Sequence, residues 1–320
     1  MTTITAPNTH AQTYGDLGYA YQFARLGLLA ELAESWNPAA EGLVPLYGEL
    51  SGSGSDIVRI ARVGGVGYAE RFASMASETD AIVASGFTSG YDSVSLGRYG
   101  LAKEGSFKQR LLARPDTGVT LQMLLEKVPA SWVKTIRYLV CVAGSGISTS
   151  TGSTSTAWSF DNELNLIRAF KETEGFEGLL YTIRHPEQFT DLAESIRSEP
   201  SLQFPEVLAA IQGLTPGGGA FNFLGANNRA SFDVQASGGA HQGFAFAPGA
   251  IGHVVAQTNP LADELANPAE ALYVPEMGLV ITRDTDGSQA TNRFDANLFI
   301  GVGLANSALF PQRRIVSVND

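Results

Sequence analysis

Cysteine is nearly absent from this chain of 320 residues, in which Cys141 is the single one and lies within the apolar stretch YLVCVAG. One thiol cannot form a disulfide within the chain, so packing must hold the fold together, as suits a reducing compartment. Such a cysteine is more often a small buried hydrophobe than a reactive thiol. We therefore expect Cys141 to be part of the core.

Positive charge and long apolar runs are also scarce. The chain has 21 Lys and Arg against 32 Asp and Glu, a formal net charge of -11, and no block of basic residues. A protein that binds nucleic acid regardless of sequence needs cations to displace counterions from phosphate. No apolar run reaches the roughly 20 residues that span a bilayer, and the N-terminus MTTITAPNTHAQTYGD does not resemble a signal peptide. We expect no membrane association and a protein made and folded in a cytoplasm.

Known catalytic and ligand-binding motifs are missing as well. There is no G-x-x-x-x-G-K-[ST] phosphate loop and no G-x-S-x-G nucleophile elbow. The GGG at positions 217–219 is not followed by the second half of a dinucleotide fingerprint. The four histidines, His10, His185, His241 and His253, are too widely scattered to show the spacing of a zinc motif. We therefore predict no catalytic residue, no metal site and no cofactor.

What the chain does contain is the composition of a globular protein, with 44% hydrophobic residues, 17% charged residues and 35 glycines. Its most informative stretch is residues 178–198, GLLYTIRHPEQFTDLAESIRS. The run Leu179 to Ile183 predicts a buried strand, and Pro186 suits the first position of a helix. Phe189, Leu192 and Ile196 recur at helical spacing. The stretch therefore predicts a strand, a sharp corner at His-Pro, and an amphipathic helix.

His185 is the best-placed titratable residue, because active sites lie at strand ends in open α/β sheets. A cytoplasmic α/β hydrolase or lyase with its site around His185 is therefore the alternative function. No nucleophile and base can be assigned near it from the sequence, and Glu187 is more simply a first-turn acid favoured by the helix dipole. We expect His185 to be a corner residue whose imidazole bonds backbone.

The region before this corner predicts three further elements. Residues 17–36 have a helical pattern behind a polar arm. Residues 43–105 hold strand-like pieces around a middle rich in glycine, serine and alanine, and the alternation in DIVRIARV leaves neither face purely apolar. An isolated hairpin of that kind is marginal in water, so it must lean on another surface, unless it is an irregular β-rich lobe of an enzyme. Residues 121–143 predict a long helix that Pro129 kinks or splits and that Gly144 ends with a left-handed cap.

Connections and later strands complete the prediction. The serine-, threonine- and glycine-rich residues 145–157 predict a flexible connector and a domain boundary. A helix capped by Asp161 follows. GLVITRD and DANLFIGVGLA predict two strands joined through Asp286-Gly287, and RRIVSV predicts a last edge strand.

The sequence HPEQFTDL, residues 185–192, resembles the HP-x-Q-[hydrophobic]-x-D-L corner of many tailed-bacteriophage major capsid proteins. The pieces SEPSLQFPEVLAAIQGL, FNFLGANNRASFDV and GFAFAPGAIGHVV follow in order. They look like that family's second helix, a strand, and a segment of its axial domain. The resemblance extends over about residues 160–255.

The resemblance implies an α+β fold of the Hong Kong 97 type. Residues 1–42 would be an N-terminal arm and helix, and residues 43–105 the extended loop, a β-hairpin that lies across the neighbouring subunit. Residues 106–157 with 272–320 would form a peripheral domain with a long spine helix. Residues 158–271 would form an axial domain with a central β-sheet.

The resemblance also implies a function without catalysis. The chain would be a major capsid protein that self-assembles into pentamers and hexamers of an icosahedral head around packaged double-stranded DNA. Its partners would be further copies of itself, a scaffolding protein, the portal and a cement protein, all in the bacterial host cytoplasm and the virion. DNA would face the inner surface without sequence-specific binding, which agrees with the acidic balance of the chain.

Overall fold

The computed structural model describes residues 43–50, 57–64, 88–106, 117–173, 176, 178–198, 221–256, 271–274, 278–286, 291–305 and 310–318. The predicted N-terminal arm and helix, residues 1–42, lie outside the described residues. So does almost all of the second helix predicted for residues 198–214. Among the described helices, none combines the length and the apolar character needed to cross a bilayer.

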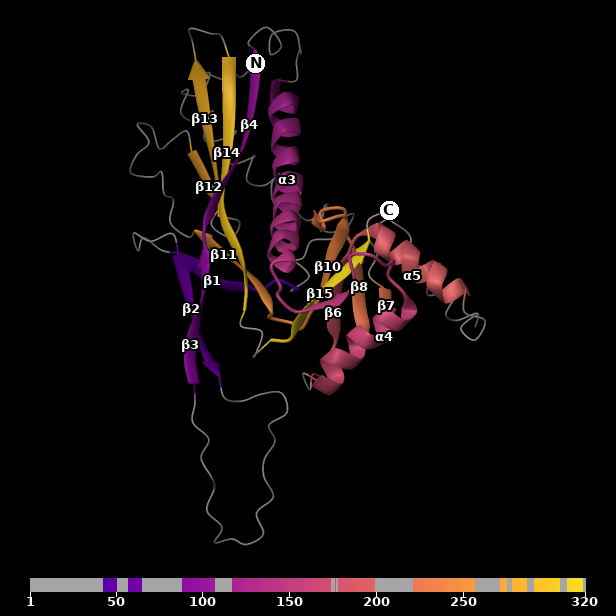
Figure 1. The fold of residues 1–320 in the computed structure, drawn as a ribbon. Helices are drawn as coiled ribbons and strands as arrows, with labels where there is room; N and C mark the ends of the chain where they lie inside the picture. Colours follow the sequence, from indigo (N-terminus) through magenta and orange to yellow (C-terminus); the bar gives the residue numbers. More distant parts are fainter. Residues whose placement is uncertain are drawn as a thin grey trace, which may run out of the picture.

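Two sheets form the body of the α+β fold (Figure 1). The long sheet has the order β1 (Leu46–Leu50), β11 (Ile251–Ala256), β14 (Thr291–Leu304), β13 (Leu279–Asp286) and β12 (Ala271–Val274), with β4 (Gly97–Ser106) also paired to β14. The compact sheet has the order β5 (Ser150–Gly152), β15 (Gln312–Val318), β10 (Ala240–Phe246), β6 (Leu180–Arg184), β8 (Ala226–Ala230) and β7 (Phe221–Phe223), with β9 (Ala236–Ser237) on β10.

A single long helix, α3 (Thr117–Ser145), packs along β14 and reaches the compact sheet (Figure 1). Its 29 residues correspond to roughly 44 Å at about 1.5 Å per residue. Of the two alternatives predicted at Pro129, a kink or a split, the split is wrong, because the helix continues through the proline. Val128 and Trp132 on either side of the proline are both buried. Their burial offsets the cost of about 3 kcal/mol that an interior proline carries.

The end of α3 also differs from the prediction. Gly144 is not a left-handed cap: it lies inside the helix and is not among the described glycines with positive φ. A Cβ at this position would lie 2.3 Å from Cδ1 of Phe244 in β10. Gly144 is therefore required by the close approach of the helix to the compact sheet. The apolar core around Ile136, Val140 and Phe244 continues from one sheet to the other.

Residues 145–157 are not the flexible connector that their composition predicted. Ile147 is 2% exposed within the core, and Ser150–Gly152 pairs in parallel with β15. The Arg314 N–H donates to the Thr149 carbonyl at 2.7 Å, and the Val318 N–H donates to the Thr156 carbonyl at 3.0 Å. Hydrogen bonds between backbone groups hold the segment in place, and such bonds cannot be predicted from amino-acid composition. The same pairing makes the predicted edge strand β15 an interior strand of its sheet.

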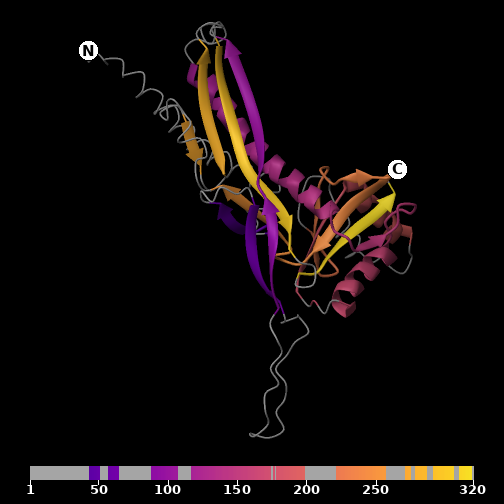
Figure 2. The same cartoon turned by 60° about the vertical axis from the view of Figure 1, so that its left-hand side comes forward.

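Strand pairing crosses the predicted domain limits. β11, predicted in the axial unit of residues 158–271, lies in the long sheet, while β15, predicted in the peripheral unit, lies in the compact sheet. β1 and β4, which fall within or overlap the predicted extended loop of residues 43–105, also belong to the long sheet. From that region, β2 (Ile57–Gly64) and β3 (Thr88–Ser95) form a separate antiparallel pair that projects beyond the long sheet (Figure 2).

Several local predictions are confirmed. β6 and α5 (Pro186–Ser198) form the predicted strand and helix on either side of His185. β13 and β14 pair antiparallel from Leu279 opposite Leu298 to Asp286 opposite Thr291. The helix α4 (Phe160–Arg168), which continues as a π-helix over Ala169–Thr173, is present but is capped by Ser159 instead of Asp161.

A second core lies where α4 and α5 pack on the compact sheet. Its members include Trp158, Phe170, Leu192, Ile196 and Ile315, each at most 1% exposed. Burial of one such side chain contributes about 1.5–3 kcal/mol. This core positions the His-Pro corner against β10 and β15.

Candidate functional site

The His-Pro corner is held by bonds between side chains and backbone. The N–H of His185 donates to Oε1 of Gln188 at 3.1 Å, and the N–H of Glu187 donates to Nδ1 of His185 at 3.3 Å. Both bonds satisfy backbone donors at the start of α5, where helix geometry provides no partner. The expectation that the imidazole bonds backbone is confirmed.

Gln188 connects this corner to two strands of the compact sheet. Its side chain is fully buried, and its Nε2 donates to Oγ of Ser317 at 3.0 Å and to the His241 carbonyl at 3.4 Å. A Cβ at Gly243 of β10 would lie 2.6 Å from Oε1 of Gln188 and 2.9 Å from the Ile183 carbonyl oxygen, so glycine is needed there. Gln188 is the glutamine of the HP-x-Q corner quoted from the sequence, but the sequence analysis predicted no role for it.

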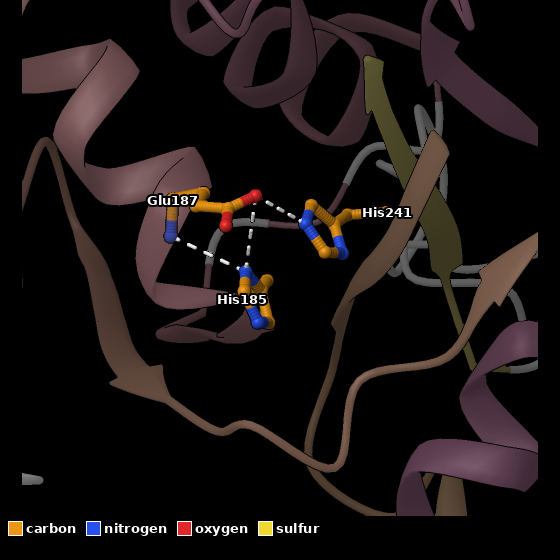
Figure 3. A group of neighbouring side chains, drawn as sticks. All are labelled: His185, Glu187 and His241. Carbon is orange, nitrogen blue, oxygen red and sulfur yellow. Dashed lines mark hydrogen bonds and ion pairs between the residues drawn. The ribbon is translucent and has the colours of Figure 1, made fainter. Parts of the chain in front are cut away.

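Three titratable side chains meet above this corner (Figure 3). Nε2 of His241 in β10 lies 2.5 Å from Oε2 of Glu187, and Nδ1 of His185 lies 3.7 Å from the same oxygen. The two imidazoles are stacked, with ring centroids 3.7 Å apart and planes inclined by 14°. Burial, together with the nearby His241, lowers the pKa of His185, and the Glu187 carboxylate opposes this shift. The four histidines are too widely scattered in the sequence to show a metal-binding spacing. In the fold, however, β10 places His241 next to the corner.

A buried ion pair lies below the same corner. The guanidinium of Arg184, at the end of β6, contacts both carboxylate oxygens of Glu163 in α4 at 2.7 and 2.8 Å, and both side chains are fully buried. Nε1 of Trp158 donates to Glu163 at 3.0 Å. The guanidinium also lies 5.4 Å from the Trp158 ring centroid. The pair fixes α4 against β6 and has no exposure to a substrate.

The arrangement around His185 does not form the pair of groups that nucleophilic catalysis requires. Within the described part of the chain, neither His185 nor His241 is hydrogen-bonded to a serine, threonine or cysteine side chain. Nδ1 of His185 already accepts a backbone N–H. Cys141 is fully buried as expected, and burial raises the pKa of its thiol to about 12, so it stays protonated at neutral pH.

The projecting β2–β3 pair is the second candidate site, and it presents apolar surface. Ile57 is 42% exposed and Tyr91 is 63% exposed, with the Arg59 guanidinium 5.0 Å from the Tyr91 ring centroid. At the root of the pair, Val94 is packed, with 3% of its surface exposed. A Cβ at Gly303 of β14 would lie 2.4 Å from Cγ2 of Val94. Val94 can therefore pack here only because residue 303 is a glycine. The pair is thus fixed at Val94 and exposed at Ile57 and Tyr91.

No protein-family model and no curated protein matches this sequence. Solved structures do match its fold. The capsid of Ralstonia phage GP4 superposes with a TM-score of 0.55 at 11% identity, over 87% of this chain and 86% of that one. The capsid asymmetric unit of cyanophage Pam1 gives 0.54 at 10% identity, over 86% and 89%. A chain of Mycobacterium phage Che8 gives 0.55 at 14% identity, over 88% and 91%.

Identities this low establish fold and not activity. The likeness nevertheless covers most of both chains, with a TM-score above 0.5 in each of the three comparisons. It agrees with the long helix on a long sheet, the second compact sheet and the projecting strand pair described above. The chain has the α+β, Hong Kong 97-type fold of tailed-phage major capsid proteins.

Proposed function

We propose that this protein is a shell subunit, the major capsid protein of a tailed phage. It assembles into pentamers and hexamers that close an icosahedral head around packaged double-stranded DNA. The observation that carries the proposal is the projecting β2–β3 pair with exposed Ile57 and Tyr91, on a chain whose fold matches phage capsid structures over most of its length.

The projecting pair is suited to contact between copies. A two-stranded hairpin is marginally stable by itself in water. Burial of an exposed aromatic residue such as Tyr91 against another surface is favourable. A second copy of the chain provides a surface for that burial. In a closed symmetric assembly the same contact is repeated many times, so each contact need contribute little for the shell to be stable.

The predicted parts of the subunit can be assigned to the observed sheets. In this proposal α3 and the long sheet form the peripheral domain, with α3 as its spine helix. The compact sheet with α4 and α5 forms the axial domain, and β2–β3 is the extended loop. Residues 1–42 remain the proposed N-terminal arm and helix.

The proposed partners follow from assembly and from charge. A net charge of -11 suits an inner surface along which DNA moves without adhering and without sequence-specific binding. A scaffolding protein, the portal and a cement protein are the further partners proposed, with assembly in the bacterial host cytoplasm. The proposed role is structural. The enzyme alternative is not favoured because, in the described part of the chain, neither His185 nor His241 is hydrogen-bonded to a serine, threonine or cysteine side chain.

The size of the purified full-length protein tests the proposal. We expect sedimentation velocity and negative-stain microscopy over a concentration series to show rings or closed shells. A protein that remains monomeric or dimeric at every concentration would overturn the proposal. Hydrolase or lyase turnover that disappears in His185→Gln with the fold intact would establish the alternative.

A further inference from the structure

We propose that His185, Glu187 and His241 bind a divalent first-row transition-metal ion of the class of Zn²⁺, Co²⁺ and Ni²⁺. The three side chains come from two elements, the corner with the first turn of α5 and strand β10 (Figure 3). One ligand atom from each lies within 4.8 Å of the others. This inference does not depend on the proposed capsid function.

The donor set selects the class of ion. Two imidazole nitrogens and one carboxylate oxygen suit zinc, cobalt, nickel and copper, whereas magnesium and calcium prefer oxygen ligands alone. Three protein ligands of this kind leave one position of a tetrahedral ion for water. The Glu187 carboxylate, which already lies 2.5 Å from His241, provides the negative charge that partly balances a divalent cation.

Gln188 holds the backbone of both histidines in place, and with it the positions from which their imidazoles project. Its Oε1 accepts the His185 N–H at 3.1 Å, and its Nε2 donates to the His241 carbonyl at 3.4 Å. Because Gln188 is fully buried, these bonds are shielded from water. The two ligands therefore project from main chains held at a set separation.

The site is open on one side and closed on the other. Glu187 has a side-chain exposure of 48%, that of His185 is 14% and that of His241 is 7%. An ion can therefore enter from solvent at the carboxylate and reach a nearly dry imidazole, where its bonds are least weakened by water.

Coordination requires one adjustment. Metal bonds lie in the plane of an imidazole, and the two rings are nearly parallel, so the His185 ring must tilt toward the ion. It then gives up the 3.3 Å bond from the Glu187 N–H, a donor at the helix start that water can satisfy. Phe232, whose ring centroid lies 5.7 Å from that of His185 in an edge-on arrangement, is 73% exposed.

A bound ion would link the start of α5 to β10 across the compact sheet. Such a link favours the folded state because the ligands are brought together only by folding. The predicted effect is a rise in the thermal unfolding temperature with added Zn²⁺.

The test uses metal-stripped, full-length protein without a polyhistidine tag, titrated with Co²⁺ and followed by visible absorption. Zn²⁺ is then added as a competitor, and thermal unfolding is recorded with and without Zn²⁺. Glu187→Ala and His241→Gln each remove one ligand, while His10→Gln and His253→Gln are matched controls at the other two histidines. We expect one Co²⁺ per chain, bound at least about tenfold more weakly by both ligand variants and unchanged in both controls.

Two outcomes would overturn the inference. One is the absence of Co²⁺ absorption and of any Zn²⁺ effect on unfolding. The other is binding that Glu187→Ala leaves unchanged, which would mean an ion held adventitiously elsewhere. If His241→Gln does not fold, Glu187→Ala decides, since this exposed side chain can be truncated with the core intact. Particle formation is not a readout, so failure here leaves the capsid proposal untouched.

Discussion

Gly144 in α3 faces the ring of Phe244 in β10 so closely that any Cβ on the glycine would lie 2.3–2.5 Å from three of its ring carbons. Phe244 is fully buried and belongs to the core that joins α3 to both sheets. The ring is therefore confined and cannot move away at low cost.

We expect Gly144→Ala to destabilise the protein by about 1–3 kcal/mol, the usual cost of overpacking, despite the better helix propensity of alanine. Urea unfolding measures the change. Gly100→Ala is the control, because its added Cβ would meet only Oδ1 of Asn297 at 3.8 Å. Equal stability of the two variants would contradict the close packing at this position.

Arg184→Met should cost about 3–5 kcal/mol, because it leaves the fully buried Glu163 carboxylate without its cation. The double variant Arg184→Met with Glu163→Gln should recover much of that loss, since the glutamine is uncharged and keeps an acceptor for Trp158. Thermal and urea unfolding of both variants measure this. A double variant no more stable than Arg184→Met alone would show that the charge is not the cause.

Shortening the projecting strand pair should separate folding from assembly. We expect replacement of residues 60–92 by Asn-Gly, which joins the paired Arg59 and Ser93 through a two-residue turn, to retain cooperative unfolding and abolish particles. The packed root residue Val94 is kept. Particle counts by microscopy and thermal unfolding are the measurements. Shells from the shortened protein, or loss of cooperative unfolding, would refute the proposed role of the pair.

Stability should fall as the pH falls below about 6.5, the ordinary pKa of histidine. Burial lowers the pKa of His253, although its bonds with the Val44 and Pro45 backbone oppose the shift. The unfolded chain therefore binds the proton first, so the contribution of His253 is complete above about pH 6.5 and is lost as pH falls through the lowered pKa.

The slope from this one group is at most about 1.4 kcal/mol per pH unit. His253→Gln should reduce the pH dependence of the unfolding free energy between pH 7 and about pH 5, measured against the parent protein at each pH. An unchanged slope in the variant would mean that other groups produce the whole effect.

Local patterns predicted much of this fold. The run before His185, the proline after it and the spacing of Phe189, Leu192 and Ile196 identify β6 and α5, because each signal lies within about ten residues. The Asp286-Gly287 signal identified the β13–β14 pair in the same way. The resemblance of HPEQFTDL to phage capsid proteins then led to the correct fold.

Pairings between distant segments were not predictable. The pairing of Ser150–Gly152 with β15 uses backbone groups, so the low-complexity sequence there resembles a free linker. Gly144 and Gly303 are explained only by the side chains that pack on them from β10 and β3. His241 joins His185 and Glu187 only once β10 pairs with β6, and a search for closely spaced ligands in the sequence cannot detect such a site.

The position of β15 sets the order in which the molecule can be completed during translation. β15 lies between β5 and β10, yet both of those neighbours leave the ribosome before it. Until residues 312–318 have emerged, a nascent chain has a gap in the middle of its compact sheet, and Gln188 lacks its partner Ser317. In the proposed shell subunit, this delay would keep unfinished chains out of the growing particle.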